Sequence, residues 1–453
     1  MARTIQILIL FLSFNNVLFG KDDAQLRKLV ASKLTTIRLP NKTYLLAEKL
    51  IIPSGKSIDG NGAKLVFLNP NNKQWMLELK SNTTIRNITI EPASSNDVFD
   101  YTINGAEKYR RFNFNYNKAF LAIWCSGIKI NLDNVKVASG FKGLGGNVNG
   151  LTITRCDFTG GYAAIELYIS KNITITHSDF KGGDFAGIAF PSCSTIKVNH
   201  CRIINPKSTG INPGGAADLS MTPFGMEFRN NSIIAGDCIN LENGAMNADI
   251  FDNTIQCAPI VNKSINNSAI GVVVHNPNAN SVVRNIKIYN NHISAYENIM
   301  YGIGINVGNF VGNEVRDIVI RNNQISGANE GIRVHNKSSY TASNVTVENN
   351  TMQTMAFGMR FYNLNNSTVR GNSAKTFYSS WNNDLWGIQI DQCKNTKFDN
   401  NKTEGFAKHY YQTSDAQNVE ISKPNILQGE FKGKPDHLFT SPKVQQHQKI
   451  NLR

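Results

Sequence analysis

The hydrophobic and polar positions of this chain repeat as one short pattern, apolar-x-apolar-x-x-Asn-x-apolar, in ten copies. The clear copies are IKIYNNHI from Ile286, IVIRNNQI from Ile318, VTVENNTM from Val345, MEFRNNSI from Met226 and ADIFDNTI from Ala248. Worn copies start at Leu151, Ile173, Ile196, Ser367 and Thr396. The alternation predicts a short strand rather than a helix, and starts 22 to 38 residues apart indicate a solenoid. We therefore expect an all-β fold, a parallel β-helix whose coils stack about 4.8 Å apart.

The chain opens with a segment typical of secretion signals. Residues 1–20 contain the positively charged Arg3 and an apolar run from Ile5 to Phe14. This run is too short to cross a membrane, and no later segment is suited to do so. We therefore expect cleavage near Gly20, no membrane span, and a secreted or periplasmic protein.

The rest of the chain is predicted to form one β-helix domain over residues 21–422, followed by a loose tail over 423–453 that is rich in Lys and Gln. Near the start of the domain, Leu26, Leu29 and Val30 lie on one face of a predicted short helix. The open end of a solenoid exposes apolar core and unpaired backbone. We therefore expect this N-terminal helix to cap the first coil.

The asparagine of each repeat is predicted to be structural. Its amide can both donate to and accept from the coils above and below, which satisfies buried turns. Cys156 and Cys201 hold the same position in two worn copies, two coils or about 9.6 Å apart, which is too far for a disulfide. We expect these cysteines to be buried free thiols. The asparagines are Asn231, Asn253, Asn291, Asn323, Asn350, Asn372 and Asn401.

A formal net charge of +14 favours a polyanionic partner. Nucleic acid is one such partner, but the chain contains no basic helix, zinc-ligand spacing or other nucleic-acid motif. An acidic polysaccharide suits a secreted solenoid better. The sequence thus predicts an acidic polysaccharide as the partner, and no nucleic acid.

The stretch LIIPSGKSIDGNG from Leu50 and the asparagine repeats resemble the right-handed parallel β-helix superfamily to which pectate lyases belong. The resemblance covers most of the chain and implies that fold. The superfamily includes polysaccharide lyases, glycoside hydrolases, uronan epimerases and phage tailspikes. The chain has neither the Asn-Thr-Asp, Asp-Asp and Gly-His-Gly set of polygalacturonases, nor the Asp-Pro-His-Asp of alginate epimerases, nor the Arg-x-Pro-x-x-Arg of pectate lyases. The resemblance therefore carries over no catalytic residue.

A second strand in each coil usually begins with a small residue, as in GIRVHN from Gly331 and GMRFYN from Gly358. Alternation then directs Arg333 and His335 outward, toward solvent. When the coils are aligned at the small residue, two outward rows result, with neighbours about 5 Å apart. One row is Asn240, Val273, Asn306, Arg333, Arg360 and Gln389, and the other is Glu242, His275, Gly308, His335, Tyr362 and Asp391.

Four members of these rows are the candidate catalytic residues for β-elimination on a uronic acid. Arg333 and Arg360 would bind the carboxylate and stabilise the enolate-like charge that develops beside it. His335, whose ordinary pKa lies near neutrality, would be the base. Tyr362 would be base or acid in the next coil. The candidate substrate-binding residues are His275, Glu242, Asn306, Asn240, Asp391, Trp381 and Trp386.

Other functions stay open at this point. A glycoside hydrolase needs two carboxylic acids about 5 to 9.5 Å apart, whereas Glu242 and Asp391, the only carboxylates of the rows, lie five coils apart. Glu166, Asp237 and Asp249 leave other carboxylate pairs open. A uronan epimerase and a non-catalytic, glycan-binding or adhesive β-helix are further alternatives. We expect no cofactor, with one loop-held Ca²⁺ as an alternative, and the oligomeric state is not determined by the sequence.

Overall fold

The computed structural model describes residues 22–69, 74–93, 98–103, 107–112, 120–183, 185–214, 223–242, 244–257, 268–274, 282–295, 302–309, 311, 314–337, 339–376, 385–422 and 425–426. The chain divides into two compact units, residues 1–183 (unit 1) and 184–453 (unit 2), each described here by itself. The predicted signal peptide at 1–20 and the predicted tail, apart from 425–426, lie outside the described residues.

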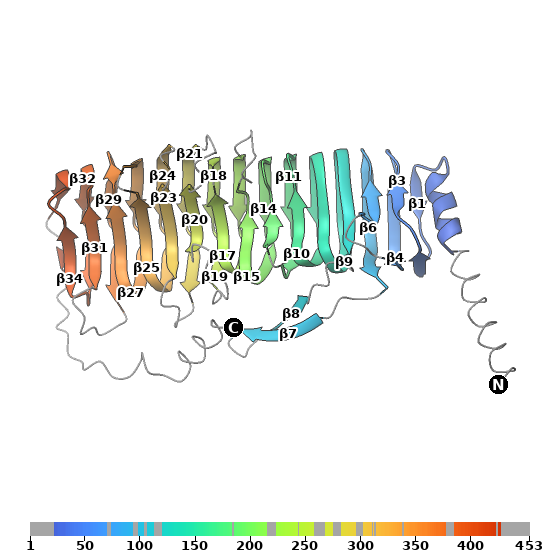
Figure 1. Ribbon diagram of the computed structural model, residues 1–453, viewed down its shortest axis with the longest axis horizontal. Coiled ribbons are helices and arrows are strands. Elements are labelled where there is room, and N and C mark those ends of the chain that lie inside the picture. Colours follow the sequence, from blue (N-terminus) through green and yellow to red (C-terminus); the bar gives the residue numbers. More distant parts are fainter. Residues whose placement is uncertain are drawn as a thin grey trace. The chain divides into compact units, whose positions relative to one another are not determined.

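Within each unit, parallel strands from successive coils pair with one another (Figure 1). Each coil has three strands and therefore three faces, one more than the repeat indicated. The additional strand arises because the residues that follow the ladder asparagine form a short strand of their own, as at His292–Ala295. We call the faces 1, 2 and 3 in the order in which the chain visits them.

In unit 1, face 1 is built from β1 (Thr36–Arg38), the starts of β4 (Ser57–Phe67) and β6 (Thr83–Pro92), stretches of β9 (Leu121–Thr154), and β11 (Lys171–Thr176). Face 2 is built from β2 (Thr43–Leu46), the ends of β4 and β6, a stretch of β9, the start of β10 (Asp157–Leu167) and β12 (Asp179–Lys181). Face 3 is built from β3 (Leu50–Ile52), β5 (Leu77–Leu79), two stretches of β9 and the end of β10. An antiparallel hairpin, β7 (Val98–Ile103) and β8 (Glu107–Phe112), interrupts these coils.

In unit 2, face 1 is built from β14 (Ser194–Asn199), β16 (Phe224–Arg229), β18 (Ala245–Phe251), β21 (Val283–Tyr289), β24 (Val315–Arg321), β26 (Ala342–Glu348), β28 (Leu364–Asn365), β29 (Thr368–Arg370), β32 (Lys394–Asp399) and β35 (Gln417–Ile421). Face 2 is built from the starts of β15 (Arg202–Asn212), β17 (Ser232–Glu242), β25 (Gln324–Asn336) and β27 (Thr351–Tyr362), with β19 (Thr254–Cys257), β22 (His292–Ala295), β30 (Ser373–Thr376), β33 (Lys402–Glu404) and β36 (Asn425–Ile426). Face 3 is built from β13 (Ala186–Ala189), the ends of β15, β17, β25 and β27, and β20 (Ser268–Val274), β23 (Ile303–Asn309), β31 (Trp386–Asp391) and β34 (Lys408–Gln412).

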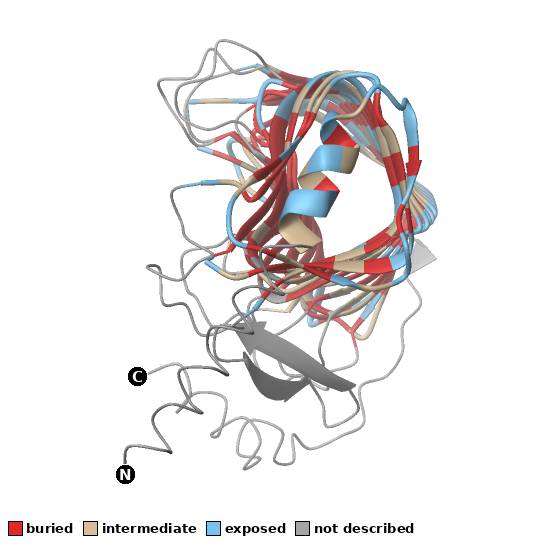
Figure 2. Cartoon of the chain, turned by 90° about the vertical axis from the view of Figure 1, so that its right-hand side faces the viewer, coloured by how far each residue is buried: buried red, intermediate tan, exposed pale blue. Residues whose placement is uncertain are grey.

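The predicted capping helix is present over residues 22–31 and lies across the end of the first coil (Figure 2). Leu26 and Val30 are buried against the core, at 1% and 3% exposure. An ion pair from Asp22 to Lys42 (2.6 Å) connects the helix to the first coil, and an ion pair from Asp23 to Arg27 (2.6 Å) lies within the helix. No helix among the described residues has the length and hydrophobicity required to cross a membrane.

The repeat asparagines of unit 2 form the expected ladder between faces 1 and 2. Asn323 is typical: its backbone N–H and its Nδ2 both donate to Oδ1 of Asn350 (3.0 and 2.9 Å), and Nδ2 also donates to the carbonyl of Ile288 (2.9 Å). The residue before it, Asn322, has a φ of 54°, a left-handed conformation that asparagine tolerates well. The Asn-Asn pair of the repeat thus supplies first the turn and then the hydrogen bonds that satisfy it.

All seven cysteines are free and buried, as expected for Cys156 and Cys201. Cys201 is part of the ladder, because its backbone N–H donates to Oδ1 of Asn231 at 2.9 Å. Burial raises the pKa of Cys156 to about 12 and that of Cys393 to about 11. These thiols therefore stay protonated at neutral pH and serve as small core side chains.

Candidate functional site

The predicted catalytic residues lie together on face 3 of unit 2. In the strand register, Arg333 of β25 pairs with Arg360 of β27, and His335 pairs with Tyr362. Asn306, in the preceding coil, pairs with Arg333. The two predicted rows are therefore correct from β23 to β31, where Gln389 and Asp391 complete them.

The predicted rows are wrong at β20. Gly271, not Val273, pairs with Asn240 and with Asn306, so Gly271 belongs to the first row. Val273 pairs with Glu242 and Gly308 and takes the place in the second row that was assigned to His275. The alignment of coils that the sequence predicted is therefore shifted by two residues at β20. His275 itself, and the side chain of Glu242, lie outside the described residues.

Arg333 is held by two polar neighbours, Asn306 and Glu330. Its Nε donates a 3.1 Å hydrogen bond to Oδ1 of Asn306, and a terminal nitrogen lies 3.7 Å from the carboxylate of Glu330. The same carboxylate oxygen lies 3.5 Å from Arg360. Both ion-pair distances are longer than a good hydrogen bond. Glu330 therefore positions and partly neutralises the two guanidiniums, but forms no short hydrogen bond with their N–H groups. Desolvation lowers the pKa of Arg333, and the charge of Arg360 adds to this against the opposing effect of Glu330.

Glu330 is the site residue that the sequence reasoning missed. It is only 7% exposed and lies three residues before Arg333. A register irregularity at the start of this part of β25 breaks the two-residue alternation. Its side chain therefore lies beside Arg333, although alternation would direct it to the other side. The only sequence signal was the proximity of an acidic residue to two arginines.

His335 and Tyr362 form the second half of the site. Their ring centroids are 5.3 Å apart at an interplanar angle of 35°. Burial, followed by the positive charges of Arg333 and Arg360, lowers the pKa of His335 to about 4, against an opposing effect of Asp391. The imidazole is therefore neutral over the physiological range and can accept a proton.

The buried amides of the site correct a second expectation. Asn240, Asn306 and Gln389 hold outward positions of the first row, but they are only 2%, 0% and 7% exposed. Asn240 Oδ1, Asn306 Nδ2 and Gln389 Oε1 have no hydrogen-bond partner among the described residues. Each such group costs about 1–3 kcal/mol, a cost that functional sites tolerate. We expected these residues to be exposed to solvent, but they are buried. In the register Asn306 lies beside Arg333 and Gln389 beside Arg360, whereas Asn240 lies further along the same row.

Aromatic side chains border the cluster. Trp386, a predicted substrate-binding residue, is the first residue of β31. Its ring contacts Phe357 edge to face at 5.7 Å and stacks on Tyr411 at 4.4 Å. Arg360 in turn lies 5.0 Å over the Phe357 ring. Trp386 thus borders the arginine cluster, whereas Trp381 lies outside the described residues.

Asp391 extends the second row beyond Tyr362 and accepts a 2.8 Å hydrogen bond from Thr413. Glu242 and Asp391 occupy the same row five strand pairings apart, as expected, so they do not form a hydrolytic pair. In the part of the chain that the structure describes, no three His, Cys, Asp or Glu side chains gather as a metal site requires.

Comparison with known proteins shows the fold. A family model for the right-handed beta helix region matches residues 310–433. The structure is similar to a mutant tailspike protein of E. coli bacteriophage HK620 in complex with a pentasaccharide, with a TM-score of 0.52, 10% identity, and coverage of 88% of this chain and 76% of that one.

Two further structures are more distantly similar. PfbA, a surface adhesin of Streptococcus pneumoniae, gives a TM-score of 0.47 at 13% identity, over 75% of this chain and 82% of that one. Bacteriophage CBA120 tailspike protein 3 gives 0.42 at 12% identity, over 90% of this chain but only 59% of that one. Comparison with curated protein sequences gives no match. The chain has the fold of the right-handed parallel β-helix proteins.

Proposed function

We propose that face 3 of unit 2 binds a uronic-acid-containing polysaccharide and cleaves it by β-elimination. The observation that carries the proposal is a neutral imidazole, His335, in one cluster with two guanidiniums and a phenol. Elimination needs these three kinds of group: a base, a cation beside the carboxylate, and an acid for the leaving oxygen.

Arg333 and Arg360 bind the substrate carboxylate in this proposal. Guanidinium groups match carboxylates in two places, and the pairing of Arg333 with Arg360 sets two such groups on neighbouring strands. Glu330, 3.5 to 3.7 Å from both, keeps the two like charges together in the free protein. The carboxylate of a bound uronate lies beside the two guanidiniums, which also stabilise the enolate-like charge that later develops there.

His335 then removes the proton on the carbon next to the carboxylate. The electron pair of that C–H bond forms a carbon–carbon double bond, and the glycosidic C–O bond at the next carbon breaks. Tyr362 donates its hydroxyl proton to the leaving oxygen, and solvent returns the proton from His335 to Tyr362. The result is an unsaturated uronate at one new end and a sugar hydroxyl at the other.

Two observations support a polysaccharide as the substrate. The net charge of +14 favours an acidic polymer. The structurally similar phage tailspike was solved in complex with a pentasaccharide, so a β-helix of this kind can hold an oligosaccharide. We also propose that the protein is secreted or periplasmic, on the basis of the signal-like pattern of residues 1–20.

The test is an ultraviolet assay for unsaturated uronate, run on a panel of acidic polysaccharides together with an assay for new reducing ends. Rising absorbance on one polymer supports the lyase. New reducing ends without absorbance support a hydrolase, and a changed uronate composition without chain cleavage supports an epimerase. Binding to a polymer without any of these products supports the adhesive alternative, and each of these three results contradicts the lyase.

A further inference from the structure

Face 3 of unit 1 carries a cluster of aromatic side chains that the proposed catalysis does not use. We call Trp75, Trp124, Phe141 and Tyr162 the aromatic patch. The rings of Trp75 and Trp124 lie 5.4 Å apart, and those of Phe141 and Tyr162 also lie 5.4 Å apart. Trp75 and Tyr162 pack against Phe141 and Leu121, yet Trp75, Trp124 and Tyr162 keep part of their surface exposed. The patch thus exposes part of its aromatic surface to solvent, while its inner side packs against buried residues.

A glycine leaves space within the patch. Gly145 lies beside Trp124 and pairs with Glu166 of the next coil. A Cβ at this position would come within 2.5 Å of the Trp75 ring and 3.4 Å of the Trp124 ring. The Trp75 indole therefore lies directly over the backbone of Gly145, beside Trp124.

Charged groups flank the patch on both sides. Glu78, which pairs with Trp124 in the strand register, forms ion pairs with Lys49 and Lys80. Burial alone would raise the pKa of Glu78, but the two lysines outweigh it and hold that pKa below its usual range. The Lys80 side chain is 42% exposed, so its ammonium group can reach a ligand.

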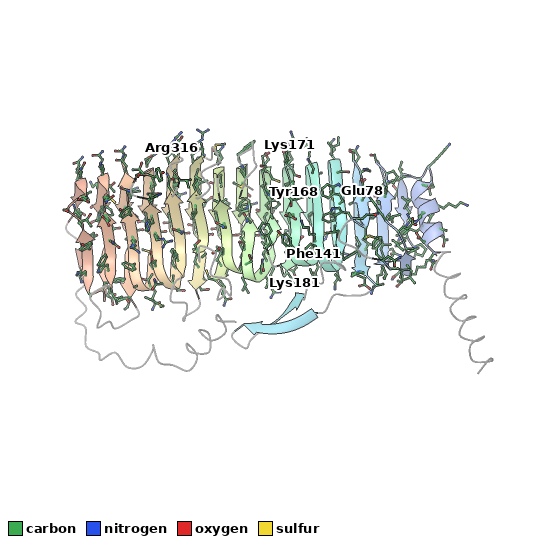
Figure 3. All side chains as sticks on the ribbon, viewed as in Figure 1. Glu78, Phe141, Tyr168, Lys171, Lys181 and Arg316 are labelled. Atoms are coloured by element: carbon green, nitrogen blue, oxygen red, sulfur yellow. The ribbon has the colours of Figure 1, made fainter. Side chains whose placement is uncertain are left out.

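On the other side, Glu166 is 4% exposed and contacts both the ammonium of Lys142 and the hydroxyl of Tyr168. The Lys142 ammonium also lies 5.0 Å over the Tyr162 ring. Figure 3 labels Glu78, Phe141 and Tyr168, which come from different coils of unit 1. Carboxylates, ammonium groups and a phenol thus surround the aromatic rings.

We propose that the aromatic patch binds the sugar rings of a polysaccharide chain. The C–H faces of a pyranose are apolar and flat enough to pack on indole and phenol rings, while its hydroxyls need polar partners at the ring edge. The patch provides both aromatic rings and polar side chains within a few strand spacings. The proposal concerns binding alone and assigns no catalytic role to the charged groups around the patch.

The alternative occupants differ in charge. A uronate chain would place carboxylates near Lys49 and Lys80, whereas a neutral chain would use only the rings and the hydrogen-bonding groups. An oligogalacturonate and a neutral cello-oligosaccharide therefore serve as two probes that share the pyranose ring. Binding is measured by calorimetry and by tryptophan fluorescence on the full chain, without any need for turnover.

The first test is Trp124→Ala, with Tyr289→Ala as its control. Tyr289 also belongs to a stacked aromatic pair, 4.7 Å from Phe251, but on face 1 of unit 2. We expect Trp124→Ala to weaken binding of at least one probe about tenfold, the size typical of a single aromatic anchor. The control variant should bind as the unchanged protein does.

A second variant covers the case in which Trp124→Ala fails to fold. Lys80→Ala removes an exposed ammonium, and Lys171→Ala, another exposed lysine of unit 1, is its control. Lys80→Ala should weaken the oligogalacturonate if the chain is acidic and leave the neutral probe unchanged. The proposal is overturned if every variant binds both probes as tightly as the unchanged protein does. It is also overturned if the unchanged protein binds neither probe. Loss of turnover without loss of binding concerns only the proposed lyase.

Discussion

Face 3 has different chemistry in the two units. In unit 1 it carries the aromatic patch between lysine–carboxylate clusters, and in unit 2 it carries arginines, an imidazole and a phenol over buried amides. The strands that hold them pair in the same parallel manner. The same coil geometry therefore carries two different sets of side chains, and these side chains give each face its own chemistry.

The turns between faces 1 and 2 differ as well. In unit 2 each ladder amide both donates and accepts: Asn323, for example, accepts from Asn291 and donates to Asn350. In unit 1 the backbone N–H of Cys156 donates to the hydroxyl of Ser178, and the Cys156 thiol accepts from Val135. A thiol is a weak hydrogen-bonding group, so unit 1 has the less strongly bonded turn at this position.

The largest expected effect is the loss of turnover when the proposed base is removed from face 3 of unit 2. His335→Ala removes the proposed base and should lower kcat about 10²- to 10⁴-fold, with little change in KM. His292→Ala is the matched control, because His292 is exposed on face 2 of unit 2. Steady-state kinetics with the ultraviolet assay measures both. Unchanged turnover in His335→Ala would remove the distinction between a binding face and a catalytic one.

The next effect concerns the cations. Arg333→Gln should lower kcat/KM about 10²- to 10³-fold, because a guanidinium that stabilises the developing charge is lost. Arg370→Gln is the control, since the Arg370 side chain is 59% exposed and pairs with Glu348 on face 1. Kinetics as a function of salt concentration provides the measurement. Equal losses in the two variants would point to net charge rather than to the site.

A third prediction compares the turns. Asn323→Ala should lower the free energy of unfolding by about 1–3 kcal/mol, because the buried Asn291 loses its acceptor and the carbonyl of Ile288 loses a donor. Cys156→Ala should cost less, since only weak thiol hydrogen bonds are lost. Gln324→Ala, an exposed neighbour of Asn323, controls for the substitution itself. Chemical denaturation measures all three, and an equal cost for Asn323 and Cys156 would contradict the comparison.

The last prediction concerns the pH dependence of stability. In the unfolded chain His335 binds a proton below about pH 6.5, whereas in the folded chain it does so only below about 4. The unfolded state therefore binds more protons between these values, and the stability that His335 contributes is lost as pH falls through this window. His335→Gln cannot titrate and should lose less stability on acidification from pH 6.5 to 4. Parallel stability curves for the two proteins would show that the imidazole is not desolvated.

Much of the site followed from the repeat. Spacing placed Arg333 beside Arg360 and His335 beside Tyr362, because each coil there begins its third strand with a glycine in the same position. The slip at His275 escaped detection because a shift of two residues preserves the inward and outward alternation. Alternation can reveal a shift of one residue but not a shift of two.

The fold, the asparagine ladder and the capping helix could be predicted from the sequence, because each rests on local periodicity and on the hydrogen-bonding capacity of single residues. The burial of Asn240 and Asn306, the contact of Glu330 with the arginines and the position of Trp75 over Gly145 became visible only in three dimensions. Burial depends on what covers a face, and side-chain contacts across a bend depend on irregular backbone. Neither property is encoded in a repeat of short strands.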